Sequence, residues 1–181
     1  AAAMEGKSME VPSPSLPVWL RLYIYGIHGF MTEVLFTAAW DLAVYKNPQL
    51  PGCTSVWSFL IYSTSVFAIE KFYRQNYKTV PLLLRCILYV LWTYIWEFST
   101  GLLLRQFNAC PWDYTERSYN FMGLITLEYA PAWFFAGLLT DQVLIKNIMY
   151  LKFATPYDSS HNHNMPANLA SAIHNGHIKT H

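Results

Sequence analysis

Three glutamates stand inside stretches that are otherwise apolar, and their chemistry is the most conspicuous in the chain. Glu33 lies in "GFMTEVLFTAAW", Glu97 in "YIWEFSTG" and Glu128 in "FMGLITLEYAPAW". An ionisable side chain near the centre of a bilayer costs about 2.5–3.5 kcal/mol by insertion scales, so such residues face a bundle interior or a wet cavity. We therefore expect the three carboxyls to converge within one helix bundle.

Few positive partners are available for these acids. His28 lies about one turn before Glu33, whereas Arg105 would have to reach two turns back to Glu97. Burial disfavours the charged carboxylate, so some of the acids could be neutral and donate hydrogen bonds. Two interpretations stay open: a site for a cation, proton or polar solute formed by Glu33, Glu97, Glu128 and His28, or glutamates that only clamp neighbouring helices.

A short loop segment, "NACPWDY", adds a second group of candidate residues. Its motif consists of Cys110, Pro111, Trp112, Asp113 and Tyr114. Proline and aspartate are turn formers, and the two aromatic rings are typical of a membrane interface or of a loop that folds back over a bundle. Asp113 could cap the segment or join the acids, and Cys110 could pair with Cys53 only in an oxidising compartment.

The elements that must position these residues are long apolar helices. Hydrophobic residues make up 54% of the 181-residue chain and charged residues 13%, well below the usual quarter for a soluble domain. Crossing a bilayer needs roughly 20 apolar residues. Four segments reach that length and show no charged outer face of a soluble helix, at about 18–43, 54–72, 82–104 and 121–145. The sequence thus predicts an all-α polytopic membrane protein, a four-transmembrane-helix bundle over 18–152, between a disordered leader (1–17) and a disordered cytosolic tail (153–181).

The orientation of the bundle follows from its lysines and arginines, which concentrate on the cytosolic side of membrane proteins. Nine lie on one predicted side and three on the other, which places both termini in the cytosol. The nine are Lys7, Arg21, Lys71, Arg74, Lys78, Arg85, Lys146, Lys152 and Lys179, and the three are Lys46, Arg105 and Arg117. The remaining acids near span ends, Asp41, Glu70 and Asp141, are predicted to be solvated at the interface.

A four-residue spacing recurs in the spans. Tyrosine precedes glutamate by eight residues at Tyr25 and Glu33, at Tyr89 and Glu97, and again at Tyr62 and Glu70. Steps of four stay on one helix face, so the pattern favours ordered polar stripes and a two-hairpin repeat. Thirteen tyrosines also make chance matches easy.

Several classes of function receive no support. The net charge of +1 gives no basic surface for nucleic acid. No GxSxG, HExxH or complete P-loop motif occurs, so no catalytic residues are assigned and the chain does not supply the ATP-hydrolysing part of a transporter. The three cysteines have no metal-binding spacing, so we expect no metal and no cofactor.

Several long strings together resemble the transmembrane protein 229 family, B-type. They are "GFMTEVLFTAAWD", "PGCTSVWSFLIY", "PLLLRCILYVLWTYIWEFSTG", "LRQFNACPWDY" and "FMGLITLEYAPAW", covering about residues 18–150, with "NGHIKT" near the end. The chain is also similar to bacterial proteins labelled ABC-transporter type IV. The resemblance implies a multi-pass membrane protein without an established activity, so it transfers no catalytic residue.

Three functional hypotheses follow. The first is a transport-related membrane protein with a buried acidic site, and four spans lead us to expect a homo-oligomer or a larger membrane partner. The second is an accessory or scaffold protein whose glutamates clamp helices. The third is an intramembrane enzyme that uses the acids and His28.

Overall fold

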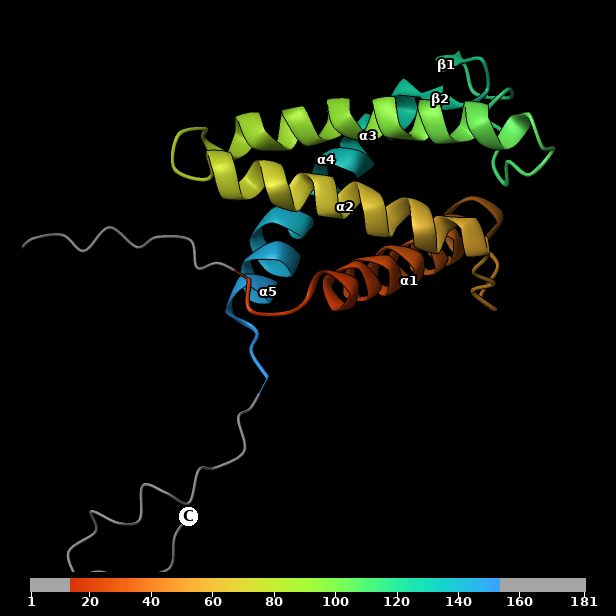
Figure 1. The fold of residues 1–181 in the computed structure, drawn as a ribbon. Helices are drawn as coiled ribbons and strands as arrows, with labels where there is room; N and C mark the ends of the chain where they lie inside the picture. Colours follow the sequence, from red (N-terminus) through yellow and green to blue (C-terminus); the bar gives the residue numbers. More distant parts are fainter. Residues whose placement is uncertain (1–13, 154–181) are drawn as a thin grey trace, which may run out of the picture. The chain divides into compact units, whose positions relative to one another are not determined.

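The computed structural model describes residues 14–153, which are mostly helical (Figure 1). Three long helices come first: α1 (Val18–Tyr45), α2 (Val56–Asn76) and α3 (Leu82–Arg105). The predictions of a disordered leader and tail fall largely on residues outside the described range. The last leader residues lie within it, where Leu16 is buried and Ser15 Oγ donates to the Leu151 carbonyl over 2.7 Å.

Local sequence explains where these helices begin and end. Pro17 and Pro81 hold extended conformations directly before α1 and α3, a backbone geometry that proline's fixed φ favours. Ser55 caps α2, because its side chain accepts a hydrogen bond from the Trp57 amide. Lys46 ends α1 in the left-handed conformation at a φ of 55°.

The fourth helix begins later than the sequence predicts. Residues before it form a small antiparallel hairpin, β1 (Asn120–Phe121) and β2 (Ile125–Thr126), and a 3₁₀ turn, η1 (Leu127–Tyr129). Helix then runs without a break through α4 (Ala130–Leu139), the π-helical segment η2 (Thr140–Ile145) and α5 (Lys146–Tyr150). The predicted start at 121 is therefore wrong by nine residues, because the hairpin and turn take up the intervening chain and Pro131 lies in the first helical turn.

Consecutive helices pack as antiparallel neighbours. Helix α1 packs on α2, α3 packs on α4, and α2 joins the two pairs through α3 and η2. The buried core lies where α1, α2, α3, η2 and α5 meet, and contains Tyr25, Val66, Ile69, Tyr73, Tyr89, Ile145, Ile148 and Met149.

A buried ion pair links α1 to α2. The Arg21 guanidinium donates to Glu70, and the hydroxyl of Tyr25, one turn along α1, donates to the other carboxylate oxygen of Glu70 over 2.8 Å. Arg74 lies 3.9 Å from the same carboxylate. The side chain of Glu70 is completely buried, so the prediction that it is solvated at an interface is wrong.

A second ion pair of the same design links α3 to η2. Arg85 Nε and Nη2 donate to the two oxygens of Asp141 over 2.9 and 2.8 Å, and the hydroxyl of Tyr89 donates to Asp141 over 2.7 Å. Asp141 is also completely buried, again against the prediction of an interfacial charge. Both acids can be buried because an arginine and a tyrosine four residues apart on the neighbouring helix compensate the carboxylate.

One described helix, Leu82–Arg105, is long and apolar enough on its own to cross a membrane. It is helix α3, which carries Glu97. The fold is therefore confirmed as all-α, with α3 as a candidate membrane span.

Candidate functional site

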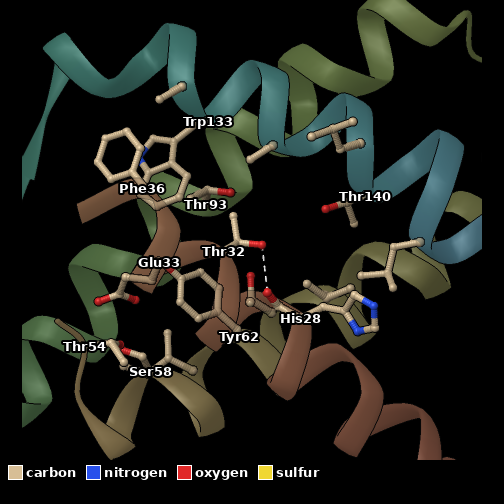
Figure 2. Close-up of a pocket in the computed structure, with 18 of the residues that line it drawn as sticks. His28, Thr32, Glu33, Phe36, Thr54, Ser58, Tyr62, Thr93, Trp133 and Thr140 are labelled. Atoms are coloured by element: carbon tan, nitrogen blue, oxygen red, sulfur yellow. Dashed lines mark hydrogen bonds between the residues drawn. The ribbon is translucent and has the colours of Figure 1, made fainter. Parts of the chain in front are cut away.

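A cavity of about 1010 Å³ lies among α1, α2, α3 and the α4–η2 helix (Figure 2). It exists because α1 packs on α2 while α4 packs on α3, which leaves space between α1 and the fourth helix. Figure 2 shows Thr32 of α1 and Thr140 of η2 on opposite sides of this space. Its volume is at the upper end of the range for small-molecule sites, which are mostly apolar with a few placed polar groups.

Three of the four predicted site residues line the cavity, namely His28, Glu33 and Glu97. Glu128 does not. It lies in η1, before the fourth helix begins, where it is exposed and accepts a hydrogen bond from Thr126 Oγ1 over 2.9 Å. The expected convergence of three carboxyls is thus reduced to two, because the predicted span placed Glu128 inside a helix that begins two residues after it.

Glu97 has one satisfied oxygen and one unsatisfied oxygen. Its Oε1 accepts a hydrogen bond from the hydroxyl of Tyr114 over 2.8 Å. Its Oε2 is buried and has no hydrogen-bond partner among the described residues. A buried carboxylate oxygen without a partner is costly. Glu97 also lines the cavity, so a bound molecule that donates a hydrogen bond to this oxygen would remove that cost.

Glu33 lies next to Tyr62, as Figure 2 shows. Tyr62 can approach α1 this closely because Gly29, one turn before Glu33, has no side chain, and a Cβ there would overlap the tyrosine. Glu33 and Tyr62 both line the cavity. The two glutamates therefore contribute acceptors to one space from different helices.

His28 is exposed at the edge of the same cavity. Its Nδ1 lies 2.8 Å from the Ile24 carbonyl on its own helix, and it has no hydrogen bond with either glutamate. Cys86 of α3 is buried and does not line the cavity, so it lies apart from His28.

The loop motif folds back onto the bundle. Trp112 Nε1 donates to the Leu124 carbonyl over 3.0 Å and its ring packs over Gly101 of α3, while Tyr114 reaches Glu97. Burial raises the pKa of Tyr114, and the nearby Glu97 charge raises it further, so the phenol remains a hydrogen-bond donor.

The other members of the motif do not join the acids. Asp113 caps the Thr115 amide at 3.1 Å and lies 3.7 Å from Arg105. Cys110 and Cys53 are both free, and Cys110 Sγ donates to the Trp112 carbonyl over 3.4 Å. Pro111 lines the cavity beside Trp112.

Two further polar atoms at the cavity wall are buried without a partner among the described residues: Thr54 Oγ1 and Trp133 Nε1. Thr54 lies two residues before α2 and Trp133 lies in the first turn of α4, so both belong to the same half of the bundle as Glu97. The sequence analysis missed both, because a threonine and a tryptophan near span ends look like ordinary interface residues.

The charge of the cavity wall is one-sided. Its lining includes two carboxylic acids and contains neither lysine nor arginine among the described residues. No group of three or more histidine, cysteine, aspartate or glutamate side chains in the described range could hold a metal ion.

Comparison with known families places this geometry in context. A family profile described as "Putative ABC-transporter type IV" matches residues 20–167, which include all the described helices except the first two residues of α1. The chain belongs to this family. No solved structure matches the chain. The name of this family associates the chain with transport-related membrane proteins, and the apolar helix α3 agrees with that association.

Proposed function

We propose that the protein is a multi-pass membrane protein that binds an organic cation in the cavity between α1 and the fourth helix, as part of a transport process. The observation that carries this proposal is Glu97, which lines a large cavity and whose buried Oε2 has no hydrogen-bond partner among the described residues. Glu33 adds a second carboxyl on the adjoining wall, and no lysine or arginine of the described lining competes for either acid. A cationic ligand would compensate both.

The same proposal includes four membrane spans with both termini in the cytosol. The unbroken helix from Ala130 to Tyr150 supports a fourth span, since about 20 residues suffice to cross the hydrocarbon. Lys71, Lys78 and Lys146 lie at the end of the bundle where α2 ends and α3 begins, the end assigned to the cytosol. Arg21 and Arg85 at this end are neutralised by buried acids, so the exposed lysines carry more of the bias.

We also propose that the chain is a B-type member of the transmembrane protein 229 family, because the strings that resemble this family fall in all four helices and in the Cys110–Tyr114 loop. These strings supply three of the residues that line the cavity, namely Glu33, Glu97 and Tyr114.

Binding of a fluorescent organic cation tests the function. The protein is reconstituted in lipid nanodiscs, and a styrylpyridinium dye is titrated while its fluorescence is followed. We expect Glu97→Gln to weaken binding by about tenfold, equivalent to about 1.4 kcal/mol, and Glu33→Gln to weaken it several-fold. Glu128→Gln is the matched control, because Glu128 is an exposed acid outside the cavity. Equal binding by all three variants would refute the cation site.

The accessory or scaffold function remains the second candidate. It is favoured by the membership of an ABC-transporter family combined with a sequence that holds no complete P-loop motif. In this case the protein works beside an ATP-binding partner or as a homo-oligomer, and its glutamates stabilise the helices. It predicts that the protein co-purifies in a larger assembly and that Glu97→Gln leaves both assembly and transport unchanged.

A further inference from the structure

We infer that the natural occupant of the cavity is a long-chain amino alcohol that enters from the bilayer between α1 and the fourth helix. This inference rests on the proposed function and narrows the organic cation to an amphiphile with an ammonium group, a neighbouring hydroxyl and an apolar chain. Three properties of the cavity carry it: the polarity of its two ends, the donors and acceptors left unpartnered, and the side on which it opens.

The cavity is polar at one end and apolar at the other. Its unpartnered atoms, on Thr54, Glu97 and Trp133, lie at the end where α3 approaches its loop and α4 begins. Towards the opposite end most of the wall is apolar, formed by Ile24, Val66, Val143, Leu144, Ile148 and Leu151, and its polar members are His28, Ser65, Thr140 and Asn147. Thr32, between the two ends, is satisfied by the His28 carbonyl at 2.7 Å. An occupant that matches both ends has a polar head and an apolar chain.

The unpartnered atoms describe the head group. Glu97 Oε2 needs a donor, Trp133 Nε1 needs an acceptor, and Thr54 Oγ1 can serve either role. An ammonium supplies the donor and a hydroxyl supplies the acceptor, so an amino alcohol satisfies all three. A phosphate-bearing head does not fit, because the described lining has two carboxylic acids and no lysine or arginine to balance the phosphate charge.

The cavity opens sideways between α1 and the fourth helix. Phe135, Leu139 and Val143 follow one another at four-residue steps along the fourth helix, line the cavity and are also exposed. Phe36 of α1 likewise lines the cavity and is exposed. In a bilayer such an apolar rim faces acyl chains, so a chain-bearing molecule can enter without leaving the hydrocarbon region.

The test uses a long-chain amino diol with a photoreactive group at the end of its chain, added to the full-length protein in nanodiscs of a zwitterionic lipid. Three comparators isolate the features of the ligand: the N-acetylated form lacks the charge, a plain long-chain amine lacks the hydroxyls, and a short-chain amino diol lacks the tail. We expect the parent compound to bind best and its crosslinks to map to peptides within 139–151.

Variants then connect each group of the ligand to the wall. Glu97→Gln should weaken the amino diol by about tenfold. Trp133→Phe and Thr54→Val should weaken the amino diol several-fold and leave the plain amine nearly unchanged, a difference that general misfolding cannot produce. Glu128→Gln and Trp19→Phe, outside the cavity, should change nothing.

The outcomes separate this inference from the proposed function. If the small dye cation binds with sensitivity to Glu97→Gln but the amino diol does not bind, the amphiphile is wrong and the cation site stands. If the N-acetylated form binds as well as the parent, or crosslinks fall outside the fourth helix, the assigned head and tail positions are overturned. If neither dye nor amino diol binds, both proposals fail.

Discussion

The hydroxyl of Tyr114 donates to Glu97 Oε1 over 2.8 Å and so joins the loop after α3 to the second half of that helix. This bond occupies one oxygen of Glu97 and leaves the other at the cavity wall. Tyr114 also packs edge-on against Tyr129 at 5.4 Å between ring centroids, which ties the loop to the start of the fourth helix. The loop thus fixes the orientation of the carboxylate that we assign to ligand binding.

Removing the Tyr114 hydroxyl tests this relationship. Tyr114→Phe should destabilise the protein by about 1.5–3 kcal/mol, because a hydrogen bond to a charged group is lost and the Glu97 oxygen stays buried. Thermal melting of the purified protein in lipid nanodiscs measures the effect. Tyr119→Phe is the control, since Tyr119 is exposed and its hydroxyl makes no hydrogen bond among the described residues. Equal melting of the two variants would contradict the assigned role of the bond.

The difference in stability between the wild type and Tyr114→Phe should depend on pH in the alkaline range. The pKa of Tyr114 is raised above its ordinary value of 10.0 by burial, then by Glu97, and to a lesser degree by Tyr62 and Tyr129. A raised pKa gives stability that is fully present below the unfolded value and is lost as pH rises through the folded value. The stability gap between wild type and Tyr114→Phe should therefore stay constant up to about pH 10 and shrink above it.

The helices were predictable from the sequence because long apolar runs bounded by proline and charge have few alternatives. Residues 82–104 and α3 agree almost residue for residue. The fourth helix was misplaced because "FMGLIT" is as apolar as a span, yet Gly123 adopts a positive φ of 66° and turns the chain into a hairpin. The hydropathy pattern alone does not indicate this turn, so Glu128 was predicted to lie inside a membrane span and was included in the site.

The buried ion pairs were not predicted although their pattern is visible in the sequence. Arg21 and Tyr25 have the same four-residue spacing as Arg85 and Tyr89, and each pair faces an acid on the following helix of its hairpin. The recurring spacing of eight residues between tyrosine and glutamate already indicated polar stripes along these helices. The arginines were used only to predict the orientation of the bundle. Their acidic partners were not predicted, because a sequence does not state which helices are neighbours.

Gly101 tests whether the loop must pack closely on α3. A Cβ at Gly101 would lie 2.7 Å from Leu124 Cδ2 and 2.9 Å from Trp112 Cζ2, so Gly101→Ala should displace the loop and cost about 1–3 kcal/mol. Binding of the organic cation should weaken as well, because Tyr114 moves with the loop. Gly137→Ala is the matched control, since its Cβ would lie 3.4 Å from the nearest Tyr89 atom. Comparable melting temperatures for the two variants would show that the loop adapts without cost.

The proposed topology predicts opposite accessibility for two cysteine positions. Cys53 is an exposed thiol between α1 and α2, and Lys78 is exposed between α2 and α3. In a background with Cys86 and Cys110 changed to serine, native Cys53 and a Lys78→Cys variant lacking Cys53 should react with a membrane-impermeant maleimide from opposite sides of sealed vesicles. Gel-shift labelling before and after permeabilisation measures this. Labelling of both positions from the same side would refute a span formed by α2.

The Arg85–Asp141 pair predicts a large effect of charge without a change in shape. Asp141→Asn keeps the volume of the side chain but leaves the Arg85 guanidinium, which is 4% exposed, without its counter-charge. The expected loss is about 3–5 kcal/mol, because breaking one side of a buried pair strands the other charge. The double change Arg85→Met with Asp141→Leu should recover part of this loss, since no charge is then stranded, while the buried Tyr89 hydroxyl still loses its acceptor. Arg74→Gln, at a side chain 39% exposed and 3.9 Å from Glu70, should cost under about 1 kcal/mol in the same melting assay. If Asp141→Asn melts like Arg74→Gln, then the pair does not hold η2 against α3, and the cavity beside η2 must be positioned by apolar packing alone.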